Sequence, residues 1–443
     1  MTVVHVESGP LAGVPVLDDL LPLDGAHALV RVDFNVPLVH GPDGRPAVED
    51  DYRIRAALPT LEWLRSRGAH VTACTHLGRP KGHADPRYDV QPVRDRLALL
   101  APGIELLQNL RFDPGEEAGD QAFADRLVAG FDVYVNDAFA CSHRAHASIV
   151  GPPTRLPSAA GLLFARETAM LGRLLDAPAR PFVAVLGGAK VADKLGVIEA
   201  MLQRADQVVV GGAMAFTFLA ALGFSTGSSV VDQAHLNTCA RILEDTGDRL
   251  VLPTDLVVLG PDGTIGSGSP GSGVPAVVGA DVPPQWQAVD IGPQTRGAFT
   301  RHIHEARSVF WNGPMGAFED PRFSAGTQAV AAAVATTDGY TVVGGGDTVA
   351  ALDEIRLADR VSFVSTGGGA ALDFLEHGDL PGLRALRTAP NAPRLAVRTG
   401  GTPRSAFAGG GAVAQYDAAG GRVGFHGSDY GRPAAIPPTR SAD

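Results

Sequence analysis

Short apolar runs alternate along the chain with longer segments whose apolar residues recur at helical spacing. Residues 28–32 form the first clear run, and residues 50–67 follow with apolar side chains three and four positions apart. The later runs lie at 70–75, 131–135, 183–186, 208–212, 309–311, 340–343 and 361–364. Strands that alternate with helices favour parallel sheets covered on both faces. The pattern therefore predicts an α/β fold of doubly wound, parallel-sheet type.

The alternation falls into two series with a break between them. We expect an N-terminal lobe over 1–165 and a C-terminal lobe over 181–386, joined by a connector at 166–180 that holds a hinge helix. Residues 387–443 are rich in Gly, Ala and Pro, which predicts a mostly disordered or loosely structured tail. Within that tail, residues 413–425 are compatible with a weak hairpin.

Two segments allow more than one interpretation. Residues 208–224 carry no charge and are at the short end for a membrane span, but Gly211 and Gly212 divide them into a strand-like and a helical part. We therefore interpret them as a buried strand, turn and helix. Residues 257–280 are rich in Gly, Ser and Pro and are expected to form a surface loop or an inserted hairpin.

The composition restricts the class of protein. Apolar residues make up 45% and charged residues 19% of the chain, which is typical of globular proteins, and the formal net charge is −11. This charge argues against a nucleic-acid or membrane partner, so any phosphate ligand needs a local basic patch. The three cysteines form no C-x-x-C motif, and the first residues do not resemble a signal peptide. We expect a cytoplasmic enzyme and find nothing that suggests an obligate oligomer, so a monomer is predicted.

The segment at 183–194 has the features of a phosphate cradle. An apolar run leads into Gly187 and Gly188, and Lys190 and Lys194 follow four positions apart, a spacing that would place both on one face of a helix. The chain has three lysines and 34 arginines, yet two of the lysines stand here. Lysine is a compact point charge, so arginine is a poor substitute at such a position.

Loops that are basic or rich in Asp and Asn follow three predicted strands of the first half. Asp33 and Asn35 come after the first run, the segment from His76 to Arg79 comes after the second, and Arg144 follows a later one. Each is individually compatible with an ordinary Asx or basic turn. Together with Arg53, they would lie at one edge of a parallel sheet, where convergent basic groups suit an anionic, phosphorylated small molecule. His143 and His146 flank Arg144, but no further ligand completes a metal site.

The second half carries glycine-rich turns after its strands. These turns match neither G-x-G-x-x-G nor G-x-x-x-x-G-K-[ST], which argues against a dinucleotide fingerprint and a P-loop. Asp347 follows three glycines and is the natural Mg²⁺ carboxylate beside a polyphosphate, and Glu319 suits a ribose hydroxyl. Helices are expected from Val349 and Leu372, and Gly367–Gly369 would offer N–H groups at a helix start. An anion-binding half and a phosphate-binding half indicate phosphoryl transfer between a nucleotide and a phosphorylated acid, by positioning and charge neutralisation.

The ordered motifs resemble those of the phosphoglycerate kinase family over roughly residues 27–386. They are RVDFNVP from Arg31, THLGRPKG from Thr75, NLRFDPGEE from Asn109, VNDAFACSHRAHAS from Val135, ARPFVAVLGGAKVADK from Ala179, WNGPMGAFE from Trp311, GGGDT and STGGGA. The resemblance implies two Rossmann-like lobes, a hinge, and reversible in-line transfer of a phosphoryl group between 1,3-bisphosphoglycerate and ADP, giving 3-phosphoglycerate and ATP in glycolysis.

The resemblance also implies roles for individual residues. Substrate binding falls to Asp33, Phe34, Asn35, Arg53, His76, Leu77, Gly78, Arg79, Arg144 and Arg180. The catalytic set is Arg53, Lys190, Gly367 and Gly368. Nucleotide binding falls to Gly188, Lys194, Gly212, Ala213, Ala288, Asn312, Glu319, Gly345, Gly346, Asp347 and Thr348, with Mg²⁺ on Asp347. Closure of the two lobes would expel water, which competes for an acyl phosphate.

Three positions depart from the usual motifs of the family. Ala213 and Ala288 stand where glycine is usual, and both would lie near the adenine, so the nucleotide preference is less secure than the phosphoryl chemistry. Gln108 replaces the usual Glu before NLRF. Two other functions stay open at this point: a catalytically weak paralogue with a binding or regulatory role, and a kinase of another phosphorylated carboxylate.

Overall fold

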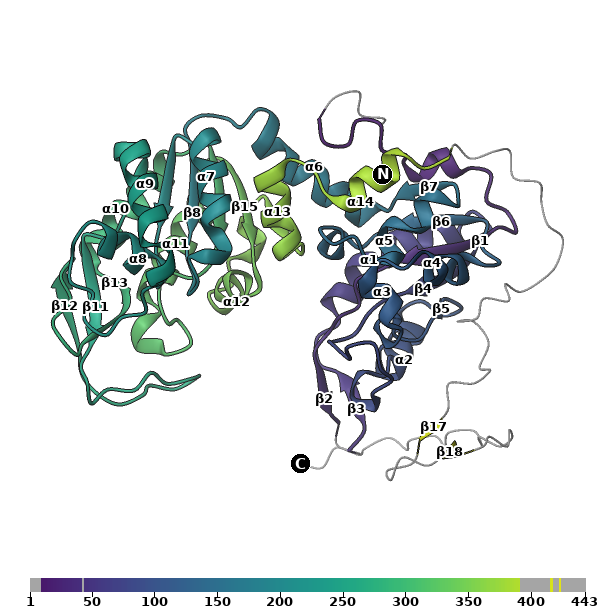
Figure 1. The fold of residues 1–443 in the computed structure, drawn as a ribbon, viewed down its shortest axis with the longest axis horizontal. Coiled ribbons are helices and arrows are strands. Elements are labelled where there is room, and N and C mark those ends of the chain that lie inside the picture. Colours follow the sequence, from purple (N-terminus) through teal and green to yellow (C-terminus); the bar gives the residue numbers. More distant parts are fainter. Residues whose placement is uncertain (1–8, 42–43, 391–414, 417–421, 424–443) are drawn as a thin grey trace, which may run out of the picture.

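The computed structural model describes residues 9–41, 44–390, 415–416 and 422–423. Two lobes lie side by side, each with a parallel sheet at its centre (Figure 1). The predicted α/β fold of two doubly wound lobes is therefore confirmed.

Five parallel strands form the N-terminal sheet in the order β5-β4-β1-β6-β7. They are β1 (His27–Arg31), β4 (His70–Cys74), β5 (Glu105–Leu106), β6 (Val133–Asn136) and β7 (Ser158–Ala160). The helices of this lobe are α1 (Tyr52–Arg65), α2 (Gln91–Leu100), α3 (Pro114–Ala118), α4 (Gln121–Val128) and α5 (Ala147–Val150), and a hairpin is formed by β2 (Leu38–His40) and β3 (Pro46–Val48). The central strands β1, β4 and β6 are largely apolar and buried because helices cover both faces of the sheet.

Six parallel strands form the C-terminal sheet in the order β10-β9-β8-β14-β15-β16. They are β8 (Phe182–Leu186), β9 (Gln207–Val210), β10 (Leu250–Val251), β14 (Ser308–Asn312), β15 (Tyr340–Gly344) and β16 (Phe363–Ser365). The helices are α7 (Leu195–Arg204), α8 (Met214–Ala221), α9 (Leu236–Thr246), α10 (Pro293–Glu305), α11 (Ala325–Thr336), α12 (Gly346–Glu354) and α13 (Gly369–His377).

A small antiparallel sheet extends the C-terminal lobe. It has the order β12-β11-β13, with β11 (Asp255–Leu259), β12 (Pro275–Gly279) and β13 (Gln287–Ile291). The hairpin predicted within 257–280 is confirmed as β11 and β12. The uncharged stretch at 208–224 forms the end of β9 and α8, and none of the helices described is long and apolar enough to cross a membrane.

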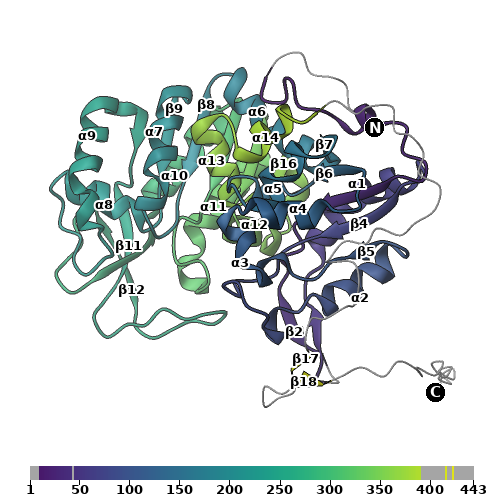
Figure 2. The same ribbon diagram turned by 45° about the vertical axis from the view of Figure 1, so that its right-hand side comes forward.

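The long helix α6 (Leu162–Asp176) joins the lobes and contacts both α1 and α13 (Figure 2). Asp137, at the end of β6, fixes its start: one carboxylate oxygen accepts hydrogen bonds from the backbone N–H groups of Leu163 and Phe164, at 3.0 and 3.2 Å. The sheet edge of the N-terminal lobe therefore sets the direction in which the connecting helix leaves.

The last described helix returns to the N-terminal lobe. Helix α14 (Pro381–Arg387) contacts α5 and β7, and the N–H of Gly382 donates to the carbonyl of Ser142 at 2.9 Å. Arg387 then donates to the carbonyl of Pro10 at 2.6 Å. Residues 381–386 thus lie with the N-terminal lobe, whereas the sequence grouped them with the C-terminal lobe, because chain order does not reveal where a final helix docks.

Two local expectations are wrong in detail. Lys190 and Lys194 do not share a helix face, because Gly188 has a φ of +108° and the chain stays irregular until a 3₁₀ turn at Ala192–Lys194. Helices α12 and α13 begin three residues earlier than expected, within the glycine turns themselves. Glycine after a strand can enter the first helical turn directly, which places bare N–H groups at the strand ends.

Most of the predicted tail at 387–443 lies outside the described residues, and so does the prediction that it is disordered. Two short strands within it, β17 (Gln415–Tyr416) and β18 (Arg422–Val423), pair antiparallel, as the hairpin within 413–425 predicts.

Candidate active site

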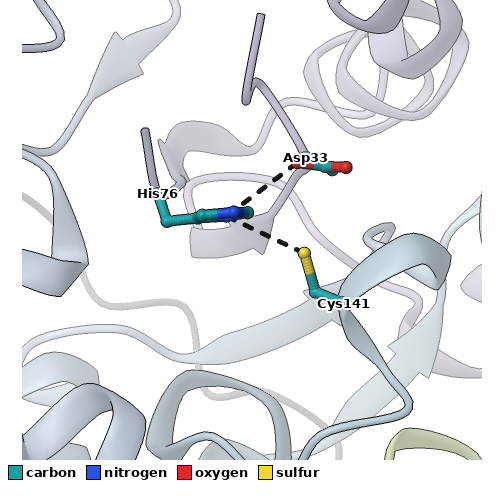
Figure 3. A group of neighbouring side chains, drawn as sticks. All are labelled: Asp33, His76 and Cys141. Carbon is teal, nitrogen blue, oxygen red and sulfur yellow. Dashed lines mark hydrogen bonds and ion pairs between the residues drawn. The ribbon is translucent and has the colours of Figure 1, made fainter. Parts of the chain in front are cut away.

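The carboxyl edge of the N-terminal sheet gathers Asp33, His76 and Cys141 (Figure 3). Asp33 follows β1, His76 follows β4, and Cys141 lies in the turn after β6. The Nδ1 atom of His76 is 3.9 Å from a carboxylate oxygen of Asp33 and 3.8 Å from the Sγ atom of Cys141. Because β1 lies between β4 and β6 in the sheet, three loops distant in sequence meet here.

Guanidinium groups surround these three side chains and determine whether they bind a metal or an anion. The three donor atoms lie within 4.8 Å of one another, a spacing that could hold a metal ion. However, Nη2 of Arg31 is 3.3 Å from Nδ1 of His76, and Arg53 forms an ion pair with Asp33. These cations thus contact the imidazole and the carboxylate, two of the three groups that a metal would need. We therefore interpret the group as one wall of an anion site.

Burial and these cations set the protonation states. Burial first, and then the charge of Arg31, hold the pKa of His76 well below its ordinary value, so the imidazole is neutral at pH 7. Burial raises the pKa of Cys141 to about 12, so its sulfur remains a thiol. Neither side chain therefore acts as a charged group in the resting site.

A second layer supports the wall. Arg31 is fully buried, and its Nε atom donates to the hydroxyl of Ser148 at 2.9 Å. That hydroxyl donates to the buried carboxylate of Glu116 at 2.6 Å. A buried charge is tolerated only with compensating partners, and here Glu116 balances Arg31 through one hydroxyl group. The end of β1 is thereby fixed.

The loop after β4 is shaped by asparagines. Asn35 accepts from the N–H of Gly78 at 2.9 Å, and Asn109 both accepts from the N–H and donates to the carbonyl of Leu77, at 3.2 and 2.7 Å. Gly78 has a φ of +61°, and a Cβ there would lie 2.2 Å from the ring of Tyr88. Only glycine fits here, so the loop keeps the tight path on which the two asparagines bind its N–H groups.

Arg111 belongs to this group, although sequence reasoning placed it only within a motif. It is 6% exposed, its Nη1 atom donates to the carbonyl of Gly78 at 2.8 Å, and its Nε atom is 3.1 Å from Glu117. Arg144 is close enough to affect the pKa of Arg111. Its position shortly after β5, at the same sheet edge, is the feature that could have identified Arg111 as a site residue.

The remaining predicted arginines do not all lie at this site. Arg79 and Arg144 are exposed on loops at this edge, and Arg53 is partly exposed in the first turn of α1. Arg180 is not brought to the group: it precedes β8, at the opposite end of that strand from Gly187, and forms an ion pair with Asp206 at 3.0 Å. Its side chain is occupied at the far edge of the other lobe.

The C-terminal lobe has a cavity of about 290 Å³ at its own sheet edge. Its walls combine glycine backbone, small apolar side chains and two carboxylates. The lining is formed by Gly188, Ala189, Gly212, Ala213, Phe216, Ser229, Val230, Ile265, Gln287, Ala288, Val289, Pro314, Met315, Gly316, Ala317, Glu319 and Asp347. Both alanines that replace a usual glycine therefore face the same cavity.

Lys194 lies beside the cavity and ties two strand ends together. Its Nζ atom donates to the carbonyls of Gly187 and Asn312, at 2.5 and 3.0 Å. Burial lowers the pKa of Lys194 to about 8, and the nearby carboxylate of Asp347 offsets part of this shift. Lys190, in contrast, is exposed on the irregular segment before the 3₁₀ turn.

The glycine turns before α12 and α13 differ in their surroundings. At α12, Gly345 has a φ of +94°, and the hydroxyl of Thr348 accepts from the N–H of Gly313 at 2.6 Å. At α13, a Cβ on Gly367 would lie 2.7 Å from the ring of Phe139, which comes from the N-terminal lobe. The second turn therefore lies where the two lobes meet, and Gly368, with a φ of +53°, directly precedes its helix.

A basic, anion-suited edge on one lobe and a cavity with glycine N–H groups on the other define a two-lobed phosphotransferase. The family model described as phosphoglycerate kinase matches residues 17–103 and 101–378. The chain belongs to the phosphoglycerate kinase family.

Individual relatives agree with this assignment. The chain is 49% identical over 389 residues to the phosphoglycerate kinase of Rubrobacter xylanophilus, covering 83% of this chain and 96% of the relative. It is 46% identical to that of a Parafrankia species, covering 84% and 99%. Among solved structures, phosphoglycerate kinase from Coxiella burnetii superposes with a TM-score of 0.75 at 35% identity, covering 84% and 98%. The enzyme from Pyrococcus horikoshii gives 0.72 at 29%, with the same coverage.

Proposed function

We propose that this chain transfers a phosphoryl group reversibly between 1,3-bisphosphoglycerate and ADP, giving 3-phosphoglycerate and ATP, as a phosphoglycerate kinase of glycolysis. One observation carries the proposal: the carboxyl edges of β1, β4, β5 and β6 gather an anion site in one lobe, while the other lobe holds a nucleotide-type cavity at its own sheet edge. Two substrates held by separate lobes suit direct transfer between them.

The N-terminal lobe binds the phosphorylated acid. Arg79, Arg144 and Arg111 supply guanidinium groups for its phosphate, and Asp33 and Asn35 suit its hydroxyl and carboxyl region. The remaining members of the set are Phe34, His76, Leu77 and Gly78, which form the wall of the site. Arg180 is left out of this set because its position and its ion pair with Asp206 separate it from the others.

The C-terminal lobe binds the nucleotide. The apolar part of the cavity, with Ala213 and Ala288, receives the base, and Glu319 accepts from the ribose. Backbone N–H groups at the start of α12 and the ammonium group of Lys194 face the phosphates. The other proposed contacts are Gly188, Gly212, Asn312, Gly345, Gly346 and Thr348.

The residues present fit a magnesium ion. Asp347 is exposed in the first turn of α12 and lines the cavity, so its carboxylate offers a hard oxygen ligand beside the nucleotide phosphates. Mg²⁺ commonly binds through one or two carboxylates together with substrate phosphates. When bound, it neutralises phosphate charge during transfer.

Transfer itself needs charge neutralisation around the moving phosphoryl group. Arg53, which Asp33 orients, contributes from the N-terminal lobe, and Lys190 contributes from the C-terminal lobe. Gly368 adds an N–H group at the start of α13. Gly367, whose N–H donates to the hydroxyl of Ser365 at 3.1 Å, brings this turn next to Phe139 of the other lobe. Closure of the two lobes about the connector at 166–180 brings these groups together and excludes water.

A coupled assay with 3-phosphoglycerate and MgATP tests the proposal. Wild type should turn over, and Arg53→Ala and Lys190→Ala should each lower kcat by about a hundredfold or more. Arg307→Ala is the matched control, because Arg307 pairs with Asp338 away from both sites and should retain wild-type rates. Absence of wild-type turnover above the two variants would overturn the proposal. Repeating the assay with GTP tests the base preference set by the two alanines.

We further propose that the enzyme works as a cytoplasmic monomer. Its three cysteines are buried and unpaired, which suits a reducing compartment. Light scattering of the purified protein should give the mass of one chain.

A further inference from the structure

The loop between β11 and β12, residues 260–274, is held by a single buried carboxylate. Asp320 is 0% exposed, and one of its oxygens accepts from the N–H groups of Gly266 and Gly271, at 2.7 and 3.0 Å. A single carboxylate oxygen thus joins the two sides of the loop. Buried carboxylates need such donors, so the loop and Asp320 satisfy each other.

Arg322 completes this arrangement from the same short turn. It donates to both carboxylate oxygens of Asp320, at 3.0 and 2.7 Å. Its other donors bind the carbonyls of Thr264, Ser272 and Gly273, at 2.8, 3.0 and 2.8 Å. The planar guanidinium therefore joins the base of the loop to Asp320, a geometry that lysine cannot reproduce. We call Asp320 and Arg322 the loop latch.

The latched loop reaches the nucleotide cavity. Ile265, next to Gly266, lines the cavity although its side chain is 45% exposed, and Val230 lines it at 68%. The N–H of Gly268 donates to the carbonyl of Glu319 at 2.9 Å, and Glu319 lines the same cavity directly before Asp320 in the chain. Exposed apolar side chains at a cavity rim are suited to cover a flat ligand.

We propose that the loop latch is a positioning device for nucleotide binding: it holds Ile265 and the backbone of Glu319 against the base and ribose of the nucleoside phosphate. This inference rests on the proposed function of the cavity. The latch touches no reacting atom, so its loss should weaken nucleotide binding and leave the transfer step intact. Without it, the loop must be ordered at the moment of binding, which costs affinity.

The experiment compares Arg322→Ala with Arg322→Lys and with Arg307→Ala, whose arginine pairs with an exposed aspartate elsewhere in the lobe. Steady-state kinetics with 3-phosphoglycerate and MgATP give KM for each substrate and kcat. Hydrogen exchange over residues 264–273 reports whether the loop is released. A further variant, Ile265→Ala, shortens the rim side chain and leaves the latch in place.

We expect Arg322→Ala to speed exchange in the loop, raise KM for ATP by about three- to tenfold, and leave KM for 3-phosphoglycerate and kcat within about twofold. Arg322→Lys should lie near Arg322→Ala, and Arg307→Ala should match wild type. Ile265→Ala should raise KM for ATP with unchanged exchange. If Arg322→Ala fails to fold, Ile265→Ala alone decides.

Several results would overturn the inference. In Arg322→Ala, these are faster hydrogen exchange in the loop with unchanged KM for ATP, unchanged hydrogen exchange, or an equal rise of KM for both substrates. In Ile265→Ala, a wild-type KM for ATP would also overturn it. Wild type without turnover would instead refute the proposed function, so the two failures are distinguishable.

Discussion

The lowered pKa of Lys194 makes nucleotide binding sensitive to pH just above neutrality. Burial places this pKa at about 8 in the free enzyme, so the ammonium group is largely charged at pH 7 and largely neutral at pH 9. From a pKa of about 8, the charged fraction falls about tenfold between these two values. If the nucleotide phosphates need the ammonium group, KM for MgATP should rise by up to about tenfold across this range.

The assay measures KM for MgATP at pH 7, 8 and 9, with Lys194→Met as the perturbation. The variant cannot titrate at this position, so its KM should be raised at pH 7 and nearly constant up to pH 9. Calorimetry in buffers of different ionisation enthalpy should show proton uptake when nucleotide binds to wild type near pH 8.5, and none attributable to this site in the variant.

The pH dependence of stability distinguishes a loss of nucleotide binding at Lys194 from unfolding of the protein. Because the folded-state pKa lies below the ordinary 10.5, the unfolded chain binds more protons between pH 8 and 10.5. The contribution of Lys194 to stability therefore rises with pH in that window. A loss of nucleotide affinity above pH 8 cannot then be assigned to unfolding caused by this group. A wild-type KM that is flat from pH 7 to 9, or a variant that keeps the full pH dependence, would refute the reasoning.

Three further predictions concern arginines and glycines at other positions. Arg111→Ala should raise KM for 3-phosphoglycerate at least about tenfold, while Arg180→Ala should leave it within about twofold, as steady-state kinetics would reveal. Gly212→Ala should lower the free energy of unfolding by more than about 2 kcal/mol, because its φ is +66° and the new Cβ would lie 2.5 Å from a backbone nitrogen. Gly297→Ala, in open space on α10, should instead raise it by about 0.5–1 kcal/mol in urea titrations. Arg387→Ala should lower Tm by about 2–4 °C with unchanged kcat, because α14 loses its hydrogen bonds to the N-terminal segment.

Periodicity predicted most of the fold because the central strands of the two parallel sheets are covered on both faces. The apolar runs at 28–32, 183–186 and 340–343 correspond to β1, β8 and β15 within about one residue at each end. Helix starts were less accurate where glycine turns run directly into a helix, as at Gly346. A glycine is typical of a turn by composition, yet its backbone can adopt the first helical conformation.

Sequence alone determined the alternation of strands and helices, the two lobes, and the sets of residues that follow each strand, because these depend on local spacing and on strand direction. Tertiary structure decided which of those residues meet. It placed Arg111 with the anion site and Arg180 at the opposite edge, docked α14 onto the first lobe, and joined Asp320 to a loop some fifty residues earlier in the chain. Such contacts depend on strand order and on the partners that buried charges require. Neither property can be deduced from the spacing of residues within a single segment.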